Sequence, residues 1–263
     1  MTTLTYAFLL TTIAGLATGI GSLLAFISKK ENASFLSISM GFSAGVMIYV
    51  SFMELLPAGQ TLLGKSEYGE WLGLGLFFMG VCCIGLIDAL IPKHENPHEF
   101  FHTIRDMKGN KRKASLLRTG LLTSLAIAVH NFPEGFATFV SVLNNPITGI
   151  GIVLAIALHN IPEGIAVSVP IFYATGNRLK AFWYSFLSGL SEPLGALIGY
   201  FFIYPFLNDA VMGGVFAFVA GIMVYISLDE LLPAAREYGK NHLSICGVFV
   251  GMAVMGASLM LLE

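Results

Sequence analysis

Two copies of one polar motif carry side chains that could hold a metal ion. The first copy, AVHNFPEGFA, covers residues 128–137, and the second, ALHNIPEGIA, covers residues 157–166, with seven of ten positions identical. Each copy places a histidine four residues before a glutamate, and residues four apart share one face of a helix. The pairs are His130 with Glu134 and His159 with Glu163. Two imidazoles and two carboxylates suit a divalent transition metal.

Further polar groups accompany each pair. Asn131 and Asn160 follow the histidines directly, so they point about 100° around the helix and could serve a second, oxygen-rich position beside the first. Pro133 and Pro162 lack an N–H, which frees a backbone carbonyl one turn earlier. Glu192, which also precedes a proline, is the best candidate for a third carboxylate. These ligands suit Zn²⁺, Fe²⁺, Mn²⁺, Co²⁺ or Ni²⁺, while the absence of placed thiolates argues against Cu⁺.

The composition predicts that both motif copies lie inside a membrane. The chain has 263 residues, of which 56% are hydrophobic and 11% charged, and its mean hydropathy is +0.77. Soluble domains carry about 25% charged residues. A charge in an apolar membrane segment costs roughly 3 kcal/mol on insertion scales unless something compensates it. The grouped polar side chains therefore indicate an intramembrane cation site.

An all-α membrane protein with eight transmembrane helices is predicted, in one transporter domain that covers residues 1–263. With about 20 apolar residues per crossing, the predicted spans are residues 4–28, 34–58, 68–91, 119–142, 147–172, 179–206, 211–235 and 243–262. The longest connection, residues 92–118, is the one substantial polar segment. Glycines spaced four apart, among them Gly41/Gly45 and Gly247/Gly251, predict close helix packing.

The distribution of basic residues predicts the orientation of these spans. Of the 14 Lys and Arg residues, all but Lys65 lie in the connections after the first, third, fifth and seventh spans. By the positive-inside rule these connections are cytoplasmic, and both termini lie on the outer face. The two motif spans then run in opposite directions, so the motif is an inverted repeat.

A second repeat is also inverted. Residues 44–58 and 220–234 agree at ten of fifteen positions, which relates the first three spans to the last three around the two motif spans. Inverted repeats with proline-broken helices are typical of secondary transporters. The repeat carries Glu54 in one copy and Asp229 and Glu230 in the other. We expect these acids near the outer and cytoplasmic mouths of a pathway, where they attract and release cations.

The connection after the third span contains a histidine tract. His94, His98 and His102 are spaced by four, which would align them on one face if the segment were helical. A flexible tract would hold metal weakly, and a solvated loop without a metal role is the third alternative. On the cytoplasmic side the tract would act as an exit relay or sensor.

At these residues the chain resembles the ZIP family of divalent metal transporters, and within it the bacterial ZupT/GufA-like branch. The resemblance covers essentially the whole chain and implies a 3+2+3 helix bundle that moves zinc, and also iron, manganese, cobalt or cadmium, into the cytoplasm. It implies location in the bacterial inner (plasma) membrane and a homodimer. It further implies a binuclear centre, whose first position uses His130, Glu134, His159 and Glu163 with Met47, and whose second uses Asn131, Glu134, Asn160, Glu163 and Glu192.

Two other classes of function remain open from the residues. An intramembrane metalloenzyme would require a base beside its metal, as in His-Glu-x-x-His, whereas each copy here has the spacing His-x-x-x-Glu. A proton-coupled carrier of a non-metal solute would use the glutamates as proton relays, but it gives no reason for two histidines. The sequence thus predicts a transporter, not an enzyme, with metal ions as substrate.

Overall fold

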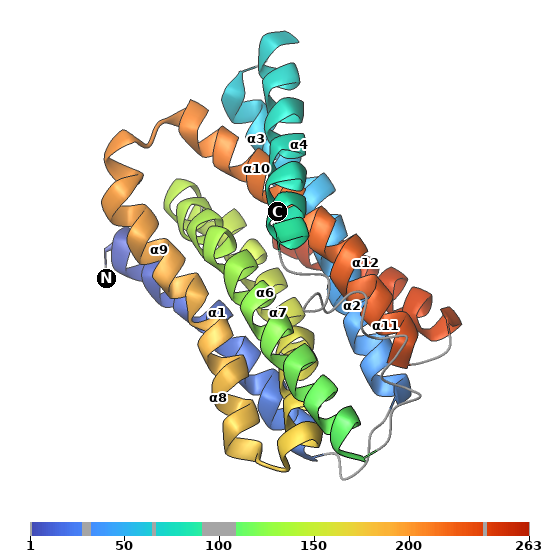
Figure 1. Cartoon of the computed structure of the whole chain (residues 1–263). Coiled ribbons are helices and arrows are strands. Elements are labelled where there is room, and N and C mark those ends of the chain that lie inside the picture. The colour runs from blue at the N-terminus through green and yellow to red at the C-terminus, as the bar shows by residue number, and fades with distance from the viewer. Residues whose placement is uncertain (1, 28–32, 65–66, 91–108, 239–240, 263) are drawn as a thin grey trace.

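A computed structural model describes residues 2–27, 33–64, 67–90, 109–238 and 241–262 (Figure 1). All elements within these ranges are helical. The longer helices are α1 (Thr3–Ile27), α2 (Ala33–Val50), α4 (Glu67–Leu90), α6 (Gly109–Asn144), α7 (Pro146–Thr175), α8 (Arg178–Gly189), α9 (Ser191–Phe202), α10 (Asp209–Ile226) and α12 (Asn241–Leu262). The shorter ones are η1 (Ser51–Leu55), α3 (Leu56–Leu63), η2 (Tyr204–Phe206), η3 (Ser227–Leu231) and α11 (Leu232–Tyr238).

The two motif helices lie at the centre of the bundle. α6 packs along α7, and α1, α8 and α9 cover this pair on one side (Figure 1). On the other side α2 packs on α12, and α10 packs on α3 and α4. The two groups meet where α2 and α12 contact α7 and where α10 contacts α6. Both copies of the motif are therefore enclosed by other helices and kept away from lipid.

Six described helical stretches are long and apolar enough to cross a membrane, so the expected all-α membrane protein is confirmed. The predicted spans 119–142 and 179–206 are not among them. The first lies within α6, which begins at Gly109, so the end of the predicted connection 92–118 is helical. The second is divided at Leu190 into α8 and α9, of 12 residues each. The polar motif lowers the mean hydropathy of the first stretch, and the break at Leu190 leaves the second as two helices that are each too short to cross a membrane.

Glycines allow the helices to approach closely, as their spacing predicted. Gly41 and Gly45 of α2 face α12, while Gly247 and Gly251 of α12 face α2. A Cβ atom at any of the four would collide with a carbonyl of the facing helix, at Ser244, Val248, Ile38 and Phe42 respectively. Small residues are what helices in lipid need for such contact, because apolar burial alone does not drive their association there.

The turn between α7 and α8 has one residue that ends the first helix and one that caps the second. Gly176 adopts a φ of 69°, a left-handed conformation that glycine accepts without strain. The side chain of Asn177 then accepts a hydrogen bond from the N–H of Lys180 at 3.0 Å and caps α8. This short turn brings α8 back against α7, so that the break at Leu190 and the start of α9 lie beside the motif helices.

Candidate metal centre

The four histidine and glutamate side chains of the motif meet between α6 and α7, and all four are buried. His130 Nε2 lies 3.3 Å from Glu134 Oε2 and 3.4 Å from Glu163 Oε1. His159 Nε2 lies 3.2 Å from Glu134 Oε1. Three residues, His130, His159 and Glu163, each offer one ligand atom, and these three atoms lie within 4.8 Å of one another. Residues 29 positions apart in the chain therefore converge on one point.

These side chains face one another at ion-pair distances, without hydrogen bonds of ordinary geometry. Both ring nitrogens of His130 and His159 and both carboxylate oxygens of Glu134 and Glu163 lack a hydrogen-bond partner. A buried polar atom without a partner destabilises a fold by about 1–3 kcal/mol. A divalent metal ion would explain this cluster, because it can accept a lone pair from one ring nitrogen of each histidine and from the carboxylate oxygens.

The spacing of the atoms fits such an ion. Tetrahedral Zn²⁺ binds nitrogen and oxygen at about 2.0–2.2 Å, which places neighbouring ligand atoms about 3.3 Å apart. The three nitrogen–oxygen distances in the centre are 3.2, 3.3 and 3.4 Å. The donor set and these three distances are therefore compatible with a mixed nitrogen and oxygen metal site.

The asparagines join this cluster to the neighbouring helices. Asn160 Nδ2 donates to the carbonyl of Ala14 at 2.9 Å and to Glu192 Oε1, and Asn131 Nδ2 donates to the carbonyl of Ser188 at 3.5 Å. Their Oδ1 atoms and Glu192 Oε2 have no hydrogen-bond partner. The amide hydrogens thus fix both side chains, and the oxygens stay available as ligands.

Glu192 reaches the cluster because the helix breaks just before it. Leu190 lies at the break, and Glu192 is in the first turn of α9, fully buried. The carboxylate interacts electrostatically with Glu134 and Glu163. A third carboxylate this close to two others is destabilising unless a cation or protons neutralise them. The structure therefore brings Glu192 next to the motif glutamates.

Met47 lies in α2, on the helix face that is turned toward α7. Ser43, one turn earlier, donates from Oγ to the carbonyl of His159 at 3.2 Å, and residues four apart share a face. Met47 is fully buried. Sequence analysis did not single out Ser43, because a lone serine in an apolar helix carries no distinguishing signal.

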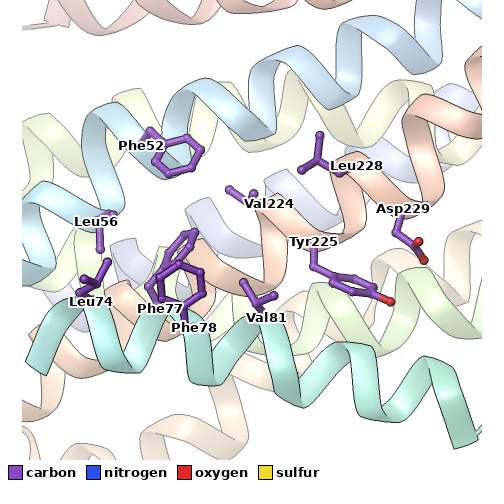
Figure 2. Close-up of a pocket in the computed structure, with 10 residues that line it drawn as sticks. All are labelled: Phe52, Leu56, Leu74, Phe77, Phe78, Val81, Val224, Tyr225, Leu228 and Asp229. Atoms are coloured by element: carbon purple, nitrogen blue, oxygen red, sulfur yellow. The ribbon is translucent and has the colours of Figure 1, made fainter.

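The acids of the second repeat occupy two matched π-helices, η1 and η3. Glu54 and Glu230 are both partly buried, and Glu230 lies close enough to His130 and Glu163 to interact electrostatically with both. Asp229 instead lines an apolar pocket of about 550 Å³ between η1, α4 and α10, where it lies beyond Tyr225 (Figure 2). Neighbouring acids that sequence analysis grouped together thus have different surroundings.

Met223, which occupies the position of Met47 in the other copy of the second repeat, is buried as well. The histidine tract at His94, His98 and His102 lies outside the residues that the structure describes.

Comparison with known proteins gives consistent matches along the chain. A family model described as "ZIP Zinc transporter" matches residues 88–259. The zinc transporter ZupT of Streptococcus mutans is 59% identical over 258 residues, covering 97% of each chain. The zinc transporter ZupT of Oceanobacillus iheyensis is 57% identical over 263 residues, again 97% of each chain. That of Clostridium perfringens is 55% identical over 271 residues, covering 97% of this chain and 95% of its own.

Proposed function

The chain belongs to the ZIP zinc transporter family, and from this membership we propose that it carries Zn²⁺ across the membrane into the cytoplasm. It is a transporter of divalent metal and not an enzyme, with the metal as substrate. The observation that carries the proposal is the buried cluster of unpartnered nitrogen and oxygen atoms from the duplicated motif. The proposed substrate range also includes Fe²⁺, Mn²⁺, Co²⁺ and Cd²⁺, because nitrogen and oxygen ligands accept all of them.

In the proposed mechanism the substrate ion exchanges its water for protein ligands in the centre. The first position uses His130, Glu134, His159 and Glu163, with Met47 as an additional ligand. A second position shares both glutamates and is completed by Asn131, Asn160 and Glu192. The three carboxylates supply the negative charge that an ion loses with its hydration shell. Glu230, within electrostatic range of the first position, receives the ion on its way out.

We propose that the fold is a single domain of eight spans arranged 3+2+3, with inverted repeats and both termini outside. Two observations support this. The π-helices η1 and η3 occur at equivalent places in the second repeat. Moreover, Gly45 of α2 faces Val248 of α12, and their counterpart Gly221 of α10 faces Phe77 of α4. The first three and last three predicted spans thus share packing as well as sequence.

The family also suggests where the protein works. We propose a location in the bacterial inner membrane and a homodimer, with Glu54 and Asp229 along the outer and inner parts of the route. The histidine tract would then bind metal after it has left the centre.

Transport is tested by uptake of radioactive Zn²⁺ into proteoliposomes. Unlabelled Fe²⁺, Mn²⁺, Co²⁺ and Cd²⁺ compete in separate assays, and the series is repeated from pH 5.5 to 7.5. We expect saturable zinc uptake that the other ions inhibit. Uptake no greater than in protein-free liposomes would contradict the proposal, and uptake of a non-metal solute would favour the other kind of carrier.

Orientation is tested by labelling single cysteines with an impermeant thiol reagent. The background lacks Cys82, Cys83 and Cys246, which are all exposed. Tyr68→Cys follows the second predicted span, and Lys180→Cys follows the fifth. Both positions are exposed, so we expect Tyr68→Cys to react only from outside and Lys180→Cys only from inside. Reaction of both from the same face would contradict the inverted topology.

A further inference from the structure

The helices that flank the centre repeat each other's contacts. Three pairs of contacts match. The contact Gly21–Ile161 matches Gly195–Phe132, and the contact Gly164–Thr18 matches Gly135–Glu192. The hydrogen bond from Asn160 to Ala14 matches the one from Asn131 to Ser188. In every match the residue of α8 or α9 follows its counterpart in α1 by 174 positions, and the residue of α7 follows that of α6 by 29. By this relation Thr18 occupies on α1 the place that Glu192 occupies on α9.

The hydroxyl of Thr18 lacks the bond that buried threonines usually make. Thr11 and Thr138 donate to the carbonyl four residues earlier, at 3.0 and 2.8 Å. For Thr18 that acceptor is the carbonyl of Ala14, which instead receives the amide of Asn160. Thr18 is fully buried, and among the side chains that the structure describes its Oγ1 is the one buried hydroxyl oxygen without a hydrogen-bond partner.

A second unpartnered oxygen lies at the same turn of α8. The Asn131 amide donates to the carbonyl of Ser188, and its Oδ1 has no partner. A Cβ atom on Gly189, the next residue, would lie 2.8 Å from Thr18 Oγ1. Asn131 therefore reaches this turn from α6 and Thr18 reaches it from α1. Both oxygens are neutral and hard. The Asn160–Glu192 pair lies close by, because Asn160 donates to the carbonyl of Ala14, one turn before Thr18 on α1.

We propose that Thr18 Oγ1 and Asn131 Oδ1 form a neutral oxygen position for the transported cation, and that Thr18 contributes to the choice among divalent ions. The inference rests on the proposed function and extends it to a residue on α1. Hard oxygens favour Mn²⁺ over the softer Cd²⁺, whereas a sulfur ligand has the opposite preference. Replacing this one oxygen should therefore change the preference in a direction set by the new atom.

The test measures how strongly unlabelled Mn²⁺ and Cd²⁺ inhibit zinc uptake into proteoliposomes. Thr18→Val keeps the shape and removes the oxygen, so the half-inhibitory concentration of Mn²⁺ should rise about fivefold while that of Cd²⁺ stays within about twofold. Thr18→Cys replaces the oxygen by sulfur and should lower the Cd²⁺ value about fivefold. Thr18→Ser keeps the hydroxyl and should stay within about twofold for both ions.

Thr11→Val serves as the matched control, because Thr11 is equally buried in α1 but is hydrogen-bonded to Ala7. A merely structural role for Thr18 would change both ions together in the valine and cysteine variants, as a packing defect at Thr11 would. Equal changes for both ions, or none, would overturn the inference. If Thr18→Val does not reach the membrane, the cysteine and serine variants decide the question. Absence of zinc uptake in the unmodified protein would instead contradict the proposed function itself.

Discussion

The two repeated segments of this protein both contain prolines, and they accommodate them differently. In α6 and α7, Pro133 and Pro162 lie inside continuous α-helices. In the second repeat, Pro57 and Pro233 follow π-helices, in which the N–H of Leu56 and of Leu232 bonds to the serine carbonyl five residues earlier. Similar sequence signals, a proline beside an acidic residue, thus give two distinct backbones.

The difference extends to the polar side chains. The histidines and glutamates of the motif helices are buried, and their ring nitrogens and carboxylate oxygens lack hydrogen-bond partners. In contrast, Glu54, Asp229 and Glu230 are partly exposed or pocket-lining, and each interacts with other groups. Buried nitrogen and oxygen atoms without partners are stabilised most when a metal ion binds between them. The comparison supports the proposal that the central pair binds substrate, and that the outer repeat, whose π-helices are typical of functional positions, shapes the route to it.

The largest effect should come from removing a central carboxylate. Glu134→Ala or Glu163→Ala should reduce uptake of every divalent metal at least about 100-fold, since each leaves two buried histidines and a neighbouring position without a shared ligand. Radiometal uptake at matched protein levels measures this. Glu70→Ala, an exposed carboxylate on α4, is the control and should transport normally. Near-normal uptake in Glu163→Ala would remove the distinction between central and outer acids.

Within the outer repeat, the two neighbouring acids should differ. Glu230→Gln should reduce the maximal rate of zinc uptake about tenfold, because Glu230 interacts electrostatically with His130 and Glu163. Asp229→Asn, which changes a carboxylate beside the route at the rim of an apolar pocket, should reduce the rate less, by about twofold. Each substitution removes one charge and keeps the side-chain shape, so the pair controls for charge alone. Equal losses in the two variants would show that the outer acids act as one group.

Acidic pH should weaken zinc binding at the central pair. Imidazoles coordinate only when neutral, and the reference pKa of histidine is about 6.5. Protons therefore compete with metal below that value, and the affinity should fall about tenfold for each of the two histidines between pH 7.5 and 5.5. Zinc titration of purified protein measures affinity separately from turnover. An affinity that is unchanged over this range would argue against His130 and His159 as ligands.

The smallest effect is expected outside the membrane. Changing His94, His98 and His102 together to alanine should keep zinc uptake within about threefold, because a weak histidine tract in a connection adds local metal concentration and not a translocation step. Initial uptake rates at several zinc concentrations measure this. Complete loss of transport at normal protein levels would place the tract on the route itself.

The sequence by itself determined the helical membrane class, the family and the residues of the centre. Apolar runs interrupted by a duplicated motif require buried ligands, and the spacing of His130 and Glu134 puts both on one face of a helix. Close packing at the glycines of α2 and α12 could also be predicted, because spacing by four is a local property of a helix. Such features depend on residues close together in the chain.

Only the tertiary structure decided how distant residues meet. The break at Leu190, which turns Glu192 toward Asn160, and the opposite surroundings of Asp229 and Glu230 depend on packing between helices that are far apart in sequence. Thr18 shows this most clearly. A threonine in an apolar helix normally bonds to its own backbone, and nothing local predicts otherwise. The carbonyl four residues before it instead accepts a hydrogen bond from the amide of Asn160, 142 positions after Thr18, and that contact exists only in the folded protein.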